Sequence, residues 1–340
     1  MSDVLVLGLD IGATVTRAMV ATASGVVVSR GSAGDEGYER AAEATAGQVL
    51  TVLRQALAAV DPPAVRAAML GLAGLDAATG GARIRAALDT AWAQAGLTCP
   101  YTQVDEALVA FAAGTAAPHG TVLVAGTGAM AAGVRDRRLN RLADGHGWLL
   151  GDVGGGFWLG RAAVRAALAE LDRARPMSEL SRLVVETLLD DDVTIDARRS
   201  TVNAVVAAVH AAPPVALARL APLVMTAYAV GDPDAIHLVQ AAADHLVETV
   251  FVVRGHGDHA PFVLAGDLLT ADTPLASSVR VRVSATWPEA EATTAGDPAA
   301  AAAWLAGLVA DPVDEPEARR RHARLLGRLS SPWTPPRSRW

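Results

Sequence analysis

Two short glycine-containing loops, each between two apolar segments, are the residues in this sequence best suited to chemistry. The first loop is Asp10-Ile11-Gly12-Ala13-Thr14, and the second is Gly126-Thr127-Gly128. Glycine lets backbone N–H groups approach an anion closely, and threonine hydroxyls add further donors. We therefore expect two related hairpins that hold one polyphosphate between two domains. This arrangement is typical of a phosphoryl-transfer site.

Asp10 ends the first apolar segment, directly before the Gly12 turn. A carboxylate at this place can hold Mg²⁺, usually through water, while the N–H groups of the turn face phosphate oxygens. The alternative is an aspartate that only satisfies backbone groups of the turn.

Asp105 follows a short predicted strand over 101–104 and precedes an apolar helix over 107–113. A carboxylate at a strand end between two domains can act as a general base toward a sugar hydroxyl, which typically contributes about 10²–10⁴ in rate. The other interpretation is an ordinary helix N-cap. The spacing alone leaves both open.

The segment over 144–160, DGHGWLLGDVGGGFWLG, is rich in glycine and costly to order, so we expect it to line a ligand. His146 and Trp148 suit a sugar, because an indole packs on ring hydrogens while polar neighbours bind hydroxyls. Asp152 can accept hydroxyl hydrogen bonds or reach a metal. The alternative for His146 and Trp148 is a packed loop without a ligand. The sequence His256-Gly-Asp258-His259 has no third metal-ligating partner nearby, which favours a solvated loop.

Composition excludes several mechanisms. The sequence contains no lysine, so a P-loop, a protein-kinase lysine and Schiff-base chemistry are excluded. The single cysteine, Cys99, excludes an internal disulfide and a CxxC zinc site. The net charge of −7 gives no reason to expect nucleic-acid binding. No signal segment or membrane span is predicted, so we expect a cytoplasmic protein.

The elements that must position these residues follow from the apolar periodicity. Strands are predicted over 4–9, 16–21, 25–30, 65–72 and 101–104, with helices over 38–60 and 81–94. The second hairpin over 121–134 repeats the same order, followed by a strand over 138–142, helical patterns including 234–253, a strand over 262–265 and a last helix over 298–309. This order predicts an α/β fold with mixed sheets flanked by helices. The segment beyond Pro312 is rich in Pro and Arg, and we interpret it as a solvated helix with a loose end rather than an interaction tail.

At these residues the chain resembles the acetate and sugar kinase/Hsc70/actin superfamily, and within it the N-acetylglucosamine kinase-like (BadF/BadG/BcrA/BcrD ATPase) family. The motifs that carry the resemblance are DIGATVT, VDEALVAFAAGT, the GTG hairpin, GHGWLLGD and GFWLGRAA. The resemblance covers about residues 5–308. It implies two actin-like (ribonuclease H-like) domains with ATP and Mg²⁺ in the cleft and an amino sugar beside them. The domains would be 1–115, completed by a helix at 297–310, and 116–296, followed by a tail over 312–340.

The resemblance also implies roles for single residues. Asp105 matches the base that activates the sugar 6-hydroxyl. The nucleotide and its metal would be held by residues of the two hairpins and a third loop: Asp10, Gly12, Thr14, Gly126, Thr127, Gly128 and Gly266. The sugar site would comprise Gly74, Asp105, His146, Trp148 and Asp152, and the metal would be held by Asp10 and Asp152.

The chain departs from the family pattern at several positions. The family commonly has DEGS where this sequence has Asp152-Val153-Gly154-Gly155, and Asp267 replaces a common glycine. The first hairpin has Ala13 and Val15 where Gly and Lys are usual. One cysteine also argues against the branch that activates 2-hydroxyacyl-CoA dehydratases and against the cysteine-rich zinc motif of ROK sugar kinases.

These observations favour an ATP-dependent kinase that phosphorylates the 6-hydroxyl of glucosamine or N-acetylglucosamine. Val153 and Asp267 motivate the alternative of a sugar- or nucleotide-sensing protein that has lost turnover. A second alternative is an ATPase coupled to a protein partner through the Arg-rich tail. A small-molecule amino sugar is the expected partner, without nucleic acid or membrane, and a homodimer is the default expectation.

Overall fold

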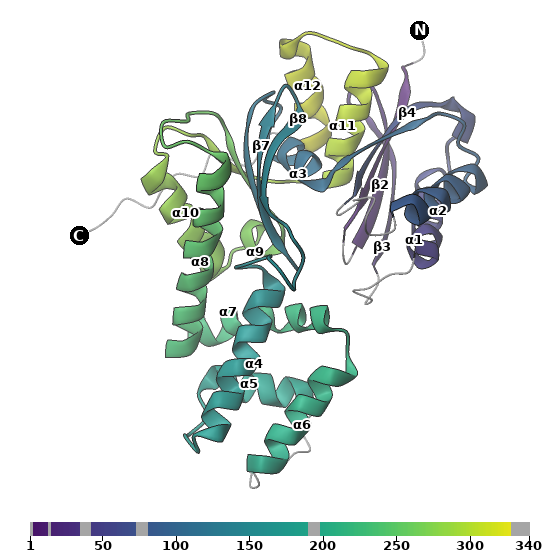
Figure 1. Ribbon diagram of the computed structural model, residues 1–340. Helices are drawn as coiled ribbons and strands as arrows, with labels where there is room; N and C mark the ends of the chain where they lie inside the picture. Colours follow the sequence, from purple (N-terminus) through teal and green to yellow (C-terminus); the bar gives the residue numbers. More distant parts are fainter. Residues whose placement is uncertain (1–2, 13–14, 35–41, 73–80, 190–197, 328–340) are drawn as a thin grey trace.

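The computed structural model describes residues 3–12, 15–34, 42–72, 81–189 and 198–327, which form two lobes, each built on one five-stranded sheet (Figure 1). The strand order is β3-β2-β1-β4-β5 in the first lobe and β10-β9-β6-β7-β8 in the second. In both sheets the first two strands of the lobe form an antiparallel hairpin, and a later strand pairs parallel to the first. The predicted α/β fold with two mixed sheets and flanking helices is therefore confirmed.

The first sheet comprises β1 (Leu5–Ile11), β2 (Val15–Thr22), β3 (Val27–Gly34), β4 (Val65–Leu72) and β5 (Tyr101–Asp105). Helices α1 (Ala42–Ala56) and α2 (Gly81–Gln94) cover one face, and α11 (Pro298–Ala310) covers the other. Successive strand residues point to opposite faces, so Leu7 packs with α1 and α2 while Val6 packs with α11.

Close packing explains the alanine run in α11. A Cβ on Gly8 of β1 would lie only 2.1 Å from the Ala299 carbonyl oxygen and 2.2 Å from the Ala303 nitrogen. The helix therefore meets the strand almost backbone to backbone, and only small side chains fit on its facing side.

The second sheet comprises β6 (Gly120–Ala125), β7 (Ala129–Arg135), β8 (Arg138–Asp144), β9 (Phe262–Ala265) and β10 (Ala292–Thr294). Its helical part contains α4 (Gly156–Asp172), α5 (Glu179–Leu189), α6 (Arg198–Ala211), α7 (Ala221–Ala229), α8 (Pro233–Val253), α9 (Asp267–Thr270) and α10 (Pro274–Thr286), and α4 to α7 extend below the sheet (Figure 1). Among the described helices, α8 alone passes a length and composition test for a membrane span. Its apolar stripe, which includes Ala242, Leu246 and Val250, is buried in the core of the second lobe. A core helix passes the same test, so α8 is weak evidence for a span.

The chain crosses between the lobes twice. Helix α3 (Glu106–Gly114) leads from β5 into β6, and the segment after β10 leads into α11. The two crossings are tied to each other, because the Gly296 N–H donates to the Ala113 carbonyl at 2.9 Å and the Thr293 hydroxyl donates to the Gly114 carbonyl at 3.0 Å. We refer to residues 112–119 and 293–297 as the hinge.

Candidate active site

Asp10 lies near the end of β1, the central strand of the first sheet. It pairs with Gly71 of β4 on one side and with Arg17 of β2 on the other. The residue is only 9% exposed, and its nearest cation, the Arg17 guanidinium, is 4.0 Å away. Burial raises the pKa of Asp10 to about 6, while Arg17 opposes the rise and Asp297 adds to it. The protein therefore compensates the negative charge of the ionised Asp10 only weakly.

Gly12 forms the tight turn that follows β1. Its N–H donates to the Val15 carbonyl at 3.1 Å, which closes the β1–β2 hairpin. Thr14, the second polar residue predicted in this loop, lies outside the described residues.

The second hairpin, Gly126-Thr127-Gly128, joins β6 to β7 and is held from behind by the start of α4. The Gly156 and Phe157 N–H groups donate to the carbonyls of Gly126 and Thr127 at 2.8 and 3.0 Å. These bonds turn the carbonyls of the loop toward α4. Within the described part of the chain, the Thr127 and Gly128 N–H groups have no protein acceptor. Free N–H groups of this kind are suited to phosphate oxygens.

Asp152 lies directly against this hairpin. Its Oδ1 accepts from the Ala129 N–H at 3.4 Å, and the residue adopts a positive φ of 56°. Burial raises the pKa of Asp152, with Asp144 adding to the rise and the Ala129 hydrogen bond opposing it. A second carboxylate therefore lies beside the second hairpin, on the opposite lobe from Asp10.

Asp144 fixes the backbone that carries Asp152. Its two carboxylate oxygens accept from the Asp152 and Val153 N–H groups at 2.7 and 3.0 Å. Asp144 is a functional residue that sequence reasoning missed. Its signal was its position at the end of a strand, before a glycine-rich loop.

Asp105 ends β5 and caps α3. Its Oδ1 accepts from the Ala107 N–H at 2.8 Å. The residue pairs with Leu72 of β4, and Leu72 also pairs with Ile11 at the end of β1. Asp105 therefore lies at the same edge of the sheet as the end of β1. The N-cap interpretation is therefore correct as a local description. The cap holds Oδ1, and Oδ2 has no hydrogen-bond donor among the described residues.

Glu106, the next residue, is a part of the site that sequence reasoning missed. Burial raises the pKa of Glu106 to about 7, and the negative charges of Asp10, Asp105 and Asp152 add to the rise. One carboxyl group thus lies within electrostatic reach of three others, drawn from both lobes. An acidic residue in the first turn of a helix is common because the helix dipole favours it, so nothing local distinguishes Glu106 from an ordinary helix start.

This acidic centre suits a magnesium ion, although the described residues contain no group of three His, Cys, Asp or Glu side chains close enough to hold a metal by themselves. Mg²⁺ is usually bound by one or two carboxylates together with water and substrate phosphates. Asp10 and Asp152, one on each lobe and each with a raised pKa, fit that role.

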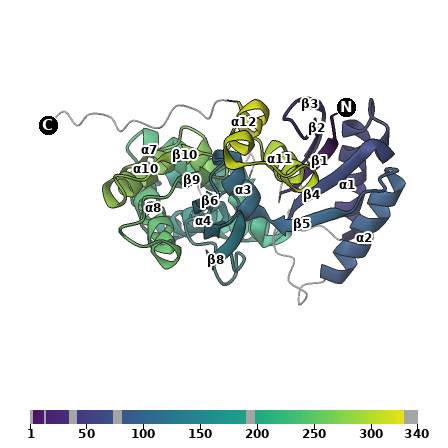
Figure 2. The same cartoon turned by 90° about the horizontal axis from the view of Figure 1, so that it is seen from above.

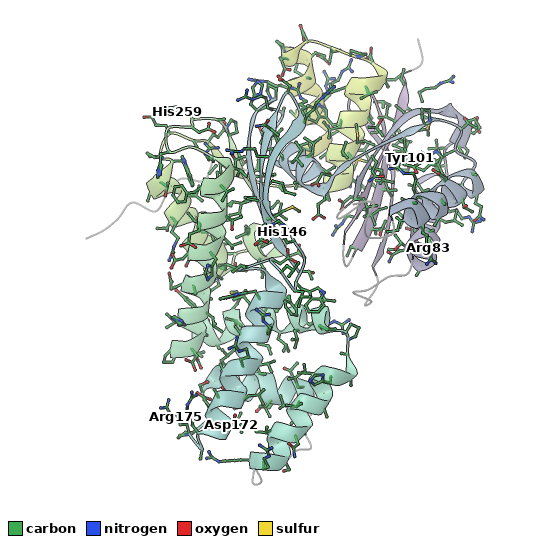
Figure 3. All side chains as sticks on the ribbon, in the orientation of Figure 1. Arg83, Tyr101, His146, Asp172, Arg175 and His259 are labelled. Atoms are coloured by element: carbon green, nitrogen blue, oxygen red, sulfur yellow. The ribbon has the colours of Figure 1, made fainter. Side chains whose placement is uncertain are left out.

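The loop over 144–155 presents the residues predicted to bind sugar. His146 is exposed, two residues after the end of β8 (Figure 3). Trp148 is half-buried, and its ring packs on Phe157 with centroids 5.3 Å apart. Arg161 lies over the other ring of this pair, 5.3 Å from the Phe157 centroid. Leu149 and Leu150 are 70% and 80% exposed. Gly74, the remaining predicted sugar residue, lies outside the described residues.

Gly266 follows β9, at the start of α9. Its φ is +83°, and a Cβ would lie 2.3 Å from the Ala125 carbonyl oxygen. Only glycine fits this position without strain. Because Ala125 directly precedes the second hairpin, Gly266 lets the loop after β9 lie against that hairpin.

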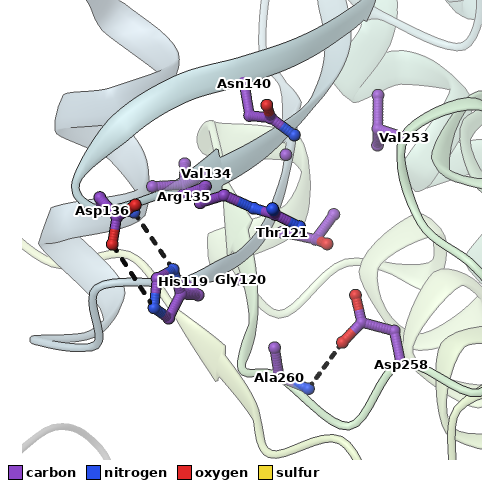
Figure 4. Close-up of a pocket in the computed structure, with 11 residues that line it drawn as sticks. His119, Gly120, Thr121, Val134, Arg135, Asp136, Asn140, Val253, Asp258 and Ala260 are labelled. Carbon is purple, nitrogen blue, oxygen red and sulfur yellow. Dashed lines mark hydrogen bonds and ion pairs between the residues drawn. The ribbon is translucent and has the colours of Figure 1, made fainter.

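Elsewhere, a pocket of about 500 Å³ lies at the opposite end of β6 and β7 from this centre (Figure 4). The predicted solvated loop over 256–259 borders it. His259 forms an exposed ion pair with Glu289 at 2.9 Å, and no metal-binding cluster is found there among the residues that the structure describes.

Comparisons with known proteins agree with this architecture. A family model described as the BadF/BadG/BcrA/BcrD ATPase family matches residues 7–306. A protein from Chromobacterium violaceum assigned as an N-acetylglucosamine kinase has a similar structure, with a TM-score of 0.68 and 22% identity over 90% of this chain and 99% of that one. A ROK family glucokinase from Streptomyces griseus, solved with glucose and AMPPNP, gives a TM-score of 0.53 and 16% identity over 94% and 98% of the two chains.

Among curated proteins, the N-acetyl-D-glucosamine kinase of Dictyostelium discoideum is 24% identical over 201 residues. The match spans 55% of this chain and 61% of the length of that relative.

Proposed function

Because the chain belongs to the BadF/BadG/BcrA/BcrD ATPase family, we propose that it is an ATP-dependent kinase that phosphorylates the 6-hydroxyl of glucosamine or N-acetylglucosamine. The observation that carries the proposal is the convergence of Asp10, Asp105 and Asp152 on Glu106. Asp10 lies at the first proposed phosphate-binding hairpin, and Asp152 lies against the second. Asp105 ends β5, at the crossing between the lobes. Likeness to sugar kinases supports the substrate class.

In this proposal the nucleotide phosphates are bound by the two hairpins. The Thr127 and Gly128 N–H groups donate to phosphate oxygens from the second lobe, and the Gly12 turn faces them from the first. Gly266 makes room for the adenosine beside the second hairpin. Asp10 and Asp152 would hold Mg²⁺, which would neutralise part of the charge on the phosphates.

The sugar is bound by the loop over 144–155. The half-buried Trp148 offers a face for the apolar side of the ring, and Asp152 and the exposed His146 offer groups for its hydroxyls. Asp144 contributes by fixing the backbone at Asp152 and Val153.

Asp105 is the proposed general base. Its Oδ1 is fixed by the Ala107 N–H, so Oδ2 can accept the proton of the sugar hydroxyl as the bond from that oxygen to the γ-phosphorus forms and the bond from the γ-phosphorus to the ADP oxygen breaks. Phosphoryl transfer relies mainly on such positioning and on charge stabilisation.

The test is ADP release from Mg-ATP with glucosamine, N-acetylglucosamine, N-acetylmuramic acid and glucose offered separately. Sugar-dependent ADP release is expected with one of the first two. ADP release indifferent to every sugar would favour the partner-coupled ATPase. Sugar or nucleotide binding by calorimetry without turnover would favour the sensor, which the apolar Val153 at a commonly acidic family position motivates.

A further inference from the structure

Helix α12 (Glu315–Leu326) follows the last residue matched by the family model, yet it is packed against the rest of the protein. Four residues on one of its faces are buried: Ala318, Arg321, His322 and Leu325. Figures 1 and 2 both place α12 beside α11 and above α3, over the junction of the lobes. The sequence interpretation of a solvated helix is therefore wrong for this face.

One set of contacts joins α12 to the first lobe. The Trp304 indole N–H of α11 donates to the Ala318 carbonyl at 3.0 Å. Arg324 donates to the Ser24 carbonyl at 2.7 Å, in the turn between β2 and β3. The neighbouring Gly25 has a φ of +99°, and a Cβ there would lie 2.7 Å from the Arg321 carbonyl oxygen. The helix is therefore seated closely on this lobe.

A second set of contacts joins α12 to the hinge. The buried His322 ring donates from Nε2 to the Ala112 carbonyl at 2.7 Å, because a carbonyl can only accept. At the end of α12, Leu326 lies 3.6 Å from the position of a Cβ on Gly296. The helix thus contacts both crossings of the chain between the lobes.

The third contact reaches the second lobe through Arg137, in the turn between β7 and β8. Its guanidinium donates to both carboxylate oxygens of Glu315 at 2.7 and 2.6 Å and to the Ala116 carbonyl at 2.9 Å. The guanidinium also lies 5.3 Å from the Trp304 ring centroid. A bidentate pair of this kind is the strongest and most directional type of side-chain ion pair.

The turn that presents Arg137 is itself fixed. Asp136 and Arg137 both adopt positive φ, near 53° and 52°, as a tight hairpin turn requires. The Asp136 N–H donates to Nδ1 of His119 at 3.1 Å, and the Arg137 N–H donates to the Pro118 carbonyl at 2.9 Å (Figure 4 shows the His119–Asp136 contacts). Arg137 is therefore held at a defined place relative to the hinge.

We propose that α12 is a strap across the hinge, seated on the first lobe and fastened to the second by the Arg137–Glu315 pair, and that it limits how far the two lobes open. The strap acts on the relative orientation of the lobes. Its action is independent of which sugar, or whether any sugar, is phosphorylated.

The test uses double electron–electron resonance between spin labels at Thr51→Cys on α1 and Val252→Cys on α8, in a Cys99→Ser background. Both labelled positions are exposed and lie on different lobes. Without nucleotide or sugar, Glu315→Gln is expected to broaden the distance distribution by about twofold. Without the Arg137–Glu315 pair, the two lobes can adopt a wider range of relative orientations. Glu315 is half-exposed, so the variant retains its fold.

Glu317→Gln is the matched control. Glu317 lies in the same helix, and among the described residues its carboxylate bonds only to arginines of α12 itself: Arg320, Arg321 and Arg324. The control is expected to give the parental distribution. A second variant, Arg137→Gln, breaks the pair from the other side and is expected to broaden the distribution as Glu315→Gln does. Parental distributions in both Glu315→Gln and Arg137→Gln would overturn the strap. Because the readout is a distance, that result is distinct from a failure of the kinase proposal.

Discussion

The carboxylate of Asp152 occupies the space that a side chain at Gly128 would need. A Cβ on Gly128 would lie 2.6 Å from Oδ2 and 2.8 Å from Cγ of Asp152. The glycine of the second hairpin and the acidic residue of the loop before α4 are therefore fitted to each other. This relationship places a proposed metal carboxylate directly beside proposed phosphate-binding N–H groups.

Gly128→Ala is accordingly expected to displace Asp152 and weaken Mg-nucleotide binding by about tenfold or more, equivalent to about 1.4 kcal/mol or more. Gly257→Ala, outside the proposed nucleotide site, is the matched control, since a Cβ on Gly257 also meets nothing within 4 Å. Isothermal titration of Mg-ADP into both variants measures the difference. Equal affinities would show that the contact between positions 128 and 152 does not shape the nucleotide site.

Asp144→Asn tests the support of the sugar loop. The amide has one oxygen where the carboxylate uses two, so either the Asp152 or the Val153 N–H loses its acceptor. We expect a loss of stability of about 1 kcal/mol and weaker sugar binding, with nucleotide binding less affected. Chemical denaturation and calorimetry with the preferred sugar give the two numbers. Weakened stability with unchanged sugar affinity would restrict Asp144 to a structural role.

Glu106→Gln tests the acidic centre through its pH dependence. The folded-state pKa of Glu106, about 7, is higher than its ordinary value of 4.5, so the folded protein binds more protons than the unfolded chain between these values. The free energy of unfolding of the ligand-free protein should therefore fall as pH rises through this window. Glu106→Gln removes this contribution. The free energy of unfolding of the variant minus that of the parent should therefore be more positive at pH 8 than at pH 5.

Urea denaturation at the two pH values measures this effect. Glu317→Gln provides a control without this pH dependence, because hydrogen bonding to Arg320 lowers the pKa of Glu317 below its ordinary value of 4.5, so its titration lies below both pH values. A stability difference for Glu106→Gln that does not grow with pH would mean that Glu106 is not in an electronegative, buried environment.

Much of the fold was predictable because apolar periodicity and glycine position report directly on backbone structure. Strand β4, helix α2 and strand β9 occur with the predicted bounds, and the two hairpins and Asp105 lie at strand ends as expected. Strand β10 was missed. It has only three residues at a sheet edge, which is too short to show an alternating pattern.

The rest depended on tertiary contacts that have no local signature. An arginine-rich sequence such as that of α12 indicates a solvated helix, yet Arg321 and His322 are buried there. Arg321 donates to Asp311, which caps the end of α11, and His322 donates to the Ala112 carbonyl, which is distant in sequence. Glu106 similarly looks like an ordinary helix start. Its significance follows from Asp152, which the fold brings across from the other lobe.

The most direct measurement of the central claim is the turnover of Asp105→Asn beside the parent, with Mg-ATP and the preferred amino sugar, and with binding of each substrate measured in parallel. Asparagine keeps the oxygen that caps α3, so the fold and both affinities should be retained while kcat falls by about 10²–10⁴. This result would establish Asp105 as the base of a sugar kinase. Sugar-dependent turnover that survives the substitution within a few-fold would contradict the account.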